Sequence, residues 1–119
     1  MFDKIKIGSN GEKIALRYLK KQGYKLLEKN YRKLRCEIDL IMYDKNTNYL
    51  VFVEVKTRSG DTYGSGAEAV TNLKQENIIK ATTVYLRENN YFNEQIRFDV
   101  VEVNAENKNV KHIISAFTL

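Results

Sequence analysis

An otherwise apolar stretch, Tyr49–Lys56, contains a carboxylate and an ammonium group two residues apart, Glu54 and Lys56. Alternate residues of a β-strand project from the same face, so these two side chains should point the same way. A charge on a buried strand is costly unless it has a partner or a function. The stretch is therefore either a strand with an ordinary ion pair or part of a site that handles charged groups.

A second strand precedes this one. Residues 37–43 have the composition of a strand, and residues 44–48 are rich in Asn and Asp, as turns are, which predicts a hairpin. A register with Tyr43 opposite Leu50 leaves a six-residue loop. A slip of one residue would turn one strand's side chains to the opposite face, unless a bulge intervened.

In that register Asp39 lies opposite Glu54, and Glu37 lies opposite Lys56. Directly opposite residues have Cβ atoms roughly 5 Å apart, close enough for two carboxylates to share one cation. Two like charges about 4 Å apart repel by about 4 kcal/mol at an effective dielectric constant of 20. The pair therefore calls for a divalent cation, a proton or a lysine, and oxygen ligands favour magnesium or manganese over zinc.

A third acid, Glu12, lies on the apolar face of a helix predicted for residues 4–22, which Gly23 should terminate. The residues of this face follow helical spacing: Glu12, Ala15, Leu16 and Leu19. Glu12 would join the other two acids if the helix packs against their strands. Alternatively, residues 9–12 fit a capping box, in which Glu12 only satisfies the backbone amide of Ser9.

The residues Glu12, Asp39 and Glu54-Val55-Lys56 resemble the signature of PD-(D/E)XK nucleases. A wider resemblance, over nearly the whole chain, is to the YraN-like family of bacterial proteins, which is also similar to archaeal Holliday junction resolvases. It is carried by these ordered blocks: 8–12, 30–32, 37–41, 51–58, 74–75 and 97–101. The resemblance implies an α/β fold with a restriction-endonuclease-like core, in which helices flank a mixed sheet.

The same resemblance implies a nuclease that hydrolyses DNA phosphodiester bonds with Mg²⁺ or Mn²⁺, with branched DNA as one structure-specific substrate. Asp39 and Glu54 would bind the metal, Glu12 would complete its shell, and the Val55 carbonyl would be a further ligand. Lys56 would orient the attacking water or stabilise charge on the phosphate. Two alternatives are a non-catalytic nucleic-acid-binding module on the same fold and an adaptor for another protein.

Nucleic acid, most simply DNA, would contact two groups of residues. Phosphate contacts are predicted just past the acids and at the start of a second helix, from Thr57, Arg58, Lys74 and Gln75. A basic patch is predicted from Lys29, Arg32, Lys33 and Arg35, with Tyr31 among them. Tyr31 and Tyr63 are candidates for stacking on unpaired bases, although core packing is the commoner role of tyrosine. A solvated basic face is the alternative for the cations.

Composition is compatible with this interpretation. The 119 residues suit one domain, 1–119, and the formal charge of +5 favours a phosphate-rich partner. The single cysteine, Cys36, excludes an intramolecular disulfide and a four-cysteine zinc site, and it occupies a position where the family usually has Gly. Without an apolar signal or a membrane-length segment, we expect a cytoplasmic protein and no membrane partner. A homodimer is compatible with the sequence.

The remaining pattern predicts the element order α-β-β-β-α-β-β. Besides the elements above, it predicts a short strand at 24–28, a helix at 72–89 with Thr71 as its N-cap, and strands at 96–103 and 110–117. Arg97 and Asp99 are two apart on a core strand and should form a structural ion pair. The segment 59–66, which contains three glycines, is predicted to be a loop that is mobile or shaped around a ligand.

Overall fold

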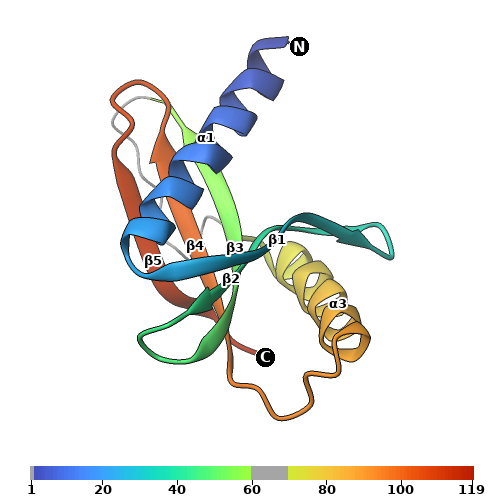
Figure 1. Ribbon diagram of the computed structural model, residues 1–119. Helices are drawn as coiled ribbons and strands as arrows, with labels where there is room; N and C mark the ends of the chain where they lie inside the picture. Colours follow the sequence, from blue (N-terminus) through green and yellow to red (C-terminus); the bar gives the residue numbers. More distant parts are fainter. Residues whose placement is uncertain (1, 60–69) are drawn as a thin grey trace.

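The computed structural model describes the backbone of residues 2–59 and 70–119, and side chains from residue 10 onwards within these ranges. Most of the predicted loop at 59–66, with Tyr63, lies outside the described residues. The elements follow in the order α1 (Phe2–Lys21), β1 (Tyr24–Lys33), β2 (Cys36–Asp44), β3 (Tyr49–Arg58), α3 (Asn72–Glu88), β4 (Ile96–Asn104) and β5 (Val110–Phe117) (Figure 1). The predicted element order is confirmed.

The five strands form one sheet in the order β1-β2-β3-β4-β5. Neighbouring strands are antiparallel except β3 and β4, which are parallel. Antiparallel neighbours can be joined by short turns, whereas a parallel pair needs a long crossover, and α3 lies in that connection. The sheet is therefore mixed, as predicted, and β3 is its central strand.

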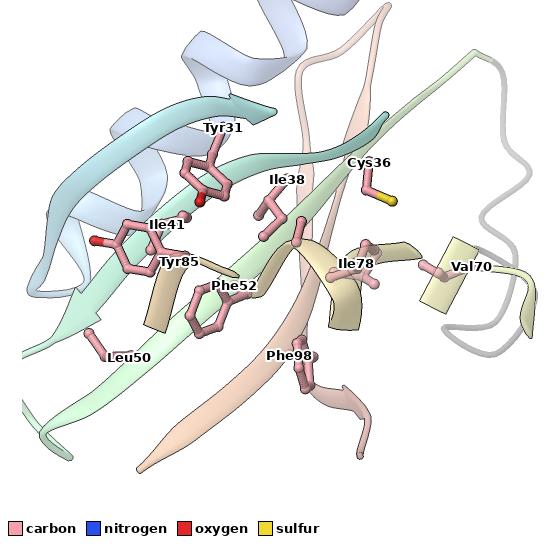
Figure 2. Packing of buried hydrophobic residues seen from close by; sticks show 12 residues of the cluster. Tyr31, Cys36, Ile38, Ile41, Leu50, Phe52, Val70, Ile78, Tyr85 and Phe98 are labelled. Atoms are coloured by element: carbon pink, nitrogen blue, oxygen red, sulfur yellow. The ribbon is translucent and has the colours of Figure 1, made fainter. Parts of the chain in front are cut away.

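Helices cover both faces of this sheet. Ala15 and Leu19 of α1 pack with Val51 and Val53 in one apolar cluster, and the helix crosses the sheet diagonally (Figure 1). The other cluster, on the α3 side, contains Tyr31, Phe52, Ile78, Tyr85 and Phe98 (Figure 2). Burying each large apolar side chain contributes roughly 1.5–3 kcal/mol. The two clusters bury β3 from Leu50 to Glu54, so the charge of Glu54 needs specific partners.

The helix boundaries agree closely with expectation. Gly23 has a positive φ of 95° just after α1, which suits its predicted role as the terminator. The Thr71 side chain accepts a hydrogen bond from Lys74 N at 3.2 Å and caps α3, also as predicted. Neither described helix combines the length and the apolarity needed to cross a membrane.

Two predictions about the first hairpins are wrong in detail. β1 continues to Lys33 rather than ending near residue 28, so the basic segment lies on a strand and in a two-residue turn. Both residues of that turn, Leu34 and Arg35, have positive φ, the signature of a type I′ turn. In the next hairpin, Asp44 pairs with Tyr49, which leaves a loop of residues 45–48 instead of the expected six residues.

Asp44 shortens that second loop because its carboxylate binds the turn itself. Its Oδ1 accepts a hydrogen bond from Asn46 N at 2.9 Å, and its Oδ2 accepts one from the Thr47 hydroxyl at 2.8 Å. An aspartate that satisfies turn groups in this way holds the hairpin register. The register in turn fixes which residues of β2 and β3 face each other.

A buried polar network ties the sheet together beneath α1. Arg97 donates two hydrogen bonds of 2.9 Å to the Asp99 carboxylate and one of 2.6 Å to the Tyr24 hydroxyl. His112 Nε2 lies 2.7 Å from Asp99 Oδ2, a contact that the sequence did not indicate. Desolvation raises the pKa of Asp99, but hydrogen bonds from His112, Arg97 and Ser115 N, together with the charge of Arg97, hold it below its ordinary value. The predicted structural ion pair is confirmed.

Asp99→Asn should destabilise the protein by about 3–5 kcal/mol, because it leaves a buried guanidinium without its main counter-charge. Urea unfolding, followed by circular dichroism, measures this loss. Glu94→Gln, which neutralises an exposed acid near the start of the same strand, is the matched control and should change stability by less than about 0.5 kcal/mol. Equal stabilities of the two variants would contradict a structural role for the network.

Gly11 allows α1 to approach β3 closely. A Cβ atom on Gly11 would lie 2.1 Å from Thr57 Oγ1 and 3.4 Å from Thr57 Cβ. Only a residue without a side chain fits this contact with the backbone as it stands. The contact fixes the distance between α1 and the sheet at the position of the next residue, Glu12.

Gly11→Ala should therefore destabilise the protein by about 1–3 kcal/mol through overpacking, although alanine is the better helix former by about 1 kcal/mol. Adding Thr57→Ala removes the clashing hydroxyl and should recover most of the loss. A double-mutant cycle in urea tests this coupling. Additive effects of the two substitutions would show that the close contact does not limit this position.

Candidate functional site

The strands β2 and β3 separate at the point where their acids lie. Tyr43 pairs with Leu50, as predicted, and the ladder ends at Leu40 and Val53. One residue beyond it, Asp39 Oδ2 accepts a hydrogen bond of 2.7 Å from Val55 N. The side-chain carboxylate of Asp39 thus accepts the hydrogen bond that Val55 N would otherwise donate to a backbone carbonyl of the neighbouring strand. We call this point, where the two strands diverge around Asp39, the fork.

The predicted pairing of Asp39 with Glu54 is not part of the ladder, which ends one pair earlier, but the fork leaves Asp39 within the field of Glu54. Burial raises the pKa of Asp39 most, the charge of Glu54 raises it further, and the Val55 amide only partly offsets them, so that the pKa reaches about 8. Glu12 and Glu37 act in the same direction. Without a cation, the fork therefore favours a proton on Asp39 near neutral pH.

The two carboxylate oxygens of Glu54 have different surroundings. Its side chain is only 4% exposed, and Oε1 lies 3.6 Å from Lys56 Nζ and 3.2 Å from Lys74 Nζ. Oε2 is buried and has no hydrogen-bond partner in the described part of the chain. Desolvation lowers the pKa of Lys74, but attraction to Glu54 and Asp39 outweighs it and the pKa is raised.

Glu12 approaches the same region from α1. Desolvation raises its pKa most, followed by the charges of Glu37 and Glu54, while a hydrogen bond from Asn30 lowers it. Because α1 begins at Phe2, Ser9 lies inside the helix and cannot be its N-cap, so the capping-box alternative is wrong. Glu12 lines a hollow of about 100 Å³ with Lys29 and Asn30.

The donor set fits a hard divalent cation in part. A cation between Asp39 and Glu54 would offset their repulsion and give the buried Glu54 Oε2 the partner that it lacks. Within residues 10–59 and 70–119, no three His, Cys, Asp or Glu side chains form a metal-binding group. Two carboxylates would therefore need other oxygens, such as the Val55 carbonyl, Glu12 after a small movement, or water.

The four residues predicted to contact phosphate do not lie together in the structure. Lys74 joins the site through Glu54, whereas Gln75 Nε2 turns back to donate to Val70 O at 3.1 Å. Arg58 Nε lies 3.7 Å from Glu102 Oε1. Thr57 faces Gly11 of α1 and so lies on the opposite side of β3 from Lys56.

The predicted basic patch lies on the β1–β2 hairpin, and much of its charge is already paired. Arg32 forms an ion pair of 3.2 Å with Glu37, and Lys33 forms one of 3.1 Å with Glu88. Arg35 is exposed in the turn.

Tyr31 is not available for base stacking. Its ring is 8% exposed and packs edge-on against Tyr85, with 5.2 Å between ring centroids (Figure 2). Its hydroxyl donates to Glu88 Oε1 at 2.5 Å. Because β1 extends to Lys33, strand alternation turns Tyr31 inward, so the stacking prediction for this residue is wrong.

Glu102 was missed by the sequence reasoning. It is fully buried on β4, opposite Lys56 in the parallel register, and neither carboxylate oxygen has a hydrogen-bond partner in the described residues. The sequence does contain a signal for it, because Glu102 is a carboxylate within the largely apolar stretch 96–103, just as Glu54 lies within an apolar strand. It adds negative charge beneath Arg58.

These features define an α/β protein with a cluster of carboxylates and lysines on the central strand of a five-stranded mixed sheet. Residues 11–103 match the model of the uncharacterised protein family UPF0102, and the chain belongs to this family. A UPF0102 protein of Caldanaerobacter subterraneus is 48% identical over 120 residues, 97% of each chain. One of Clostridioides difficile is 44% identical over 110 residues, 92% of this chain and 95% of its own. The family resemblance predicted from the sequence is confirmed.

The pKa of Asp39 predicts how stability depends on pH when a chelator is present. Between about pH 5 and 8 the folded protein keeps a proton that the unfolded chain has already released, so stability should fall as pH rises. Asp39 alone contributes a slope of at most roughly 1.4 kcal/mol per pH unit, and Glu12, whose pKa is also raised, contributes a further slope of the same sign.

Urea unfolding between pH 5.5 and pH 8 measures this slope. Asp39→Asn should flatten it, because the amide does not titrate, whereas Glu106→Gln, at an exposed acid in the turn between β4 and β5, should leave it unchanged. Identical slopes in wild type and Asp39→Asn would exclude a raised pKa at this residue.

Proposed function

We propose that this protein is a metal-dependent endonuclease of the PD-(D/E)XK type, which hydrolyses phosphodiester bonds in DNA. The main support is the fork between β2 and β3, where the carboxylate of Asp39 lies within the field of Glu54 and Glu54 keeps a buried oxygen without a hydrogen-bond partner among the described residues. Phosphodiester hydrolysis requires positive charge at the phosphate and an oriented nucleophile. The fork offers a place for the cation, and lysines surround it.

Each residue has a distinct role in this proposal. Asp39, Glu54 and the Val55 carbonyl would hold Mg²⁺ or Mn²⁺, with Glu12 or water completing the shell. The ion would supply Lewis-acid polarisation of the phosphate oxygens. Positions of the protein ligands are fixed in advance, since the Val55 amide holds Asp39 and the β3 backbone holds Glu54.

Lys56 would contact the phosphate or the attacking water. It lies beside Glu54 on the same face of β3, and 34% of its side chain is exposed, so it meets both the acids and an incoming substrate. Lys74 approaches Glu54 from α3 and is also half-exposed. Binding of a cation would free one or both lysines from Glu54 and make their charge available to the substrate.

A non-catalytic nucleic-acid-binding module is the second candidate, and one observation favours it. Lys56 and Lys74 already compensate the charge of Glu54, so the cluster is stable without a metal. In that case the acids and lysines would serve as a structural ion cluster between β3 and α3. The two candidates differ in whether the fork binds a divalent cation and uses it to cleave DNA.

Calorimetric titration with Mn²⁺ and cleavage assays on branched, single-stranded and duplex DNA distinguish them. Wild type should bind the ion, and Asp39→Asn or Glu54→Gln should weaken binding at least about tenfold, or about 1.4 kcal/mol. Lys56→Met should leave ion binding largely unchanged and slow cleavage about 10²–10³-fold. Glu106→Gln, at an exposed acid far along the chain from the fork, should behave as wild type.

Absence of Mn²⁺ binding at millimolar concentration would exclude the nuclease mechanism. Ion binding without cleavage of any of the three substrates would favour the binding module instead.

A further inference from the structure

The outer face of α1 carries unpaired positive charge. Lys13, Arg17 and Lys20 follow one another at spacings of four and three residues, so they lie on one side of the helix, and all three are exposed. The charged residues from 13 to 21 are all basic. Within residues 10–59 and 70–119, none of these three side chains, nor Lys29 nearby, forms an ion pair.

This surface is hollowed, and the hollow extends to Glu12, the acid that α1 contributes to the candidate site. A depression of about 290 Å³ is lined by Lys13, Leu16, Arg17 and Lys20. The smaller hollow of about 100 Å³ at Glu12 and Lys29 shares Lys13 and Leu16 with it. The two hollows therefore adjoin at these side chains, and together they define a surface along α1 from Glu12 to Lys20, here called the α1 groove.

The length of the α1 groove suits a nucleic-acid strand. Eight residues of helix separate Glu12 from Lys20, which corresponds to about 12 Å at 1.5 Å per residue. A strand of duplex DNA advances about 3.4 Å per nucleotide, so the groove spans roughly three to four nucleotides. Leu16 gives its floor an apolar surface between the cations.

The ion pairs of the protein favour this surface over the β1–β2 hairpin as the binding site for nucleic acid. Two cations of the hairpin, Arg32 and Lys33, already have carboxylate partners in Glu37 and Glu88. An unpaired cation can bind a phosphate and release a counterion from the nucleic acid without first giving up an internal partner. The apolar face of α1 is buried in the core through Ala15 and Leu19, so the helix has no apolar face left to insert into a lipid surface.

We propose that the α1 groove binds the phosphate backbone of a nucleic-acid strand and leads it to the fork at Asp39 and Glu54. The proposal rests on the proposed function for the direction in which the strand runs, whereas binding itself requires no hydrolysis. The cations Lys13, Arg17, Lys20 and Lys29 contact phosphates, and Glu12 marks the end of the groove at the site.

The test compares binding of fluorescein-labelled 20-nucleotide DNA and RNA, single-stranded and duplex, in EDTA, by anisotropy over a range of salt concentrations. The triple variant Lys13→Gln, Arg17→Gln, Lys20→Gln should bind at least about tenfold more weakly. On duplex DNA the slope of log affinity against log salt should fall by about 0.9 for each lost phosphate contact, roughly 2–3 in total. The DNA and RNA arms decide which backbone is preferred.

A matched control neutralises three exposed lysines on other elements, Lys45→Gln, Lys80→Gln and Lys111→Gln, and should keep most of the wild-type affinity and slope. The hairpin variant Arg32→Gln, Lys33→Gln should lose less affinity than the α1 variant. Urea unfolding of each variant shows that the fold is retained, since these side chains lie at the surface.

Equal losses of nucleic-acid affinity in the α1 variant and the lysine control would overturn the proposal that the α1 groove binds nucleic acid. Failure of wild type to bind any of the four nucleic acids would also overturn it. Binding of anionic vesicles that disappears in the α1 variant, without nucleic-acid binding, would also overturn it in favour of a lipid surface. A protein that binds through the α1 groove but cleaves nothing would contradict the nuclease alone. Cleavage by wild type with unaltered binding of the α1 variant would contradict the groove alone.

Discussion

The hydrogen bond from Val55 N to Asp39 Oδ2 is the interaction on which the candidate site depends. It forms where β2 leaves β3, and it replaces a ladder bond with a bond to a side-chain carboxylate. The amide would otherwise be a buried donor without a partner, so the fork is stable only with an acceptor such as Asp39 in place. The bond holds Asp39 in a buried position within the field of Glu54, and burial and that charge raise the pKa of Asp39 more than the bond itself lowers it.

Two buried charge clusters in this protein differ in how completely they are satisfied. Asp99 receives hydrogen bonds from Arg97 and from Ser115 N and contacts His112, so its carboxylate is fully used. Glu54 shares one oxygen with two lysines and leaves the other without a partner in the described residues. A satisfied network stabilises the fold, whereas an unsatisfied one marks a place where a ligand can supply what is missing. This contrast separates the structural cluster from the candidate site.

Similar reasoning separates the basic surfaces. The hairpin looks favourable from its sequence, but Arg32 and Lys33 already form ion pairs with Glu37 and Glu88, and Tyr31 belongs to the core. Helix α1 positions Glu12, and its outer face also carries cations that form no ion pair within the described residues and a hollow that extends to Glu12. Membership of the UPF0102 family gives the chain well-matched relatives but no activity, so function has to be argued from these surfaces.

The sequence alone determined the element order, the Thr71 cap and the pairing of Tyr43 with Leu50, because turn chemistry and strand alternation are local. It also predicted the family. Only the tertiary structure decided that Lys74 reaches Glu54, that Tyr31 is buried, that Glu102 has Arg58 nearby but no hydrogen bond within the described residues, and that two hollows adjoin along α1. These outcomes depend on contacts between elements far apart in the chain, and no local pattern encodes which of several basic residues will find an acid.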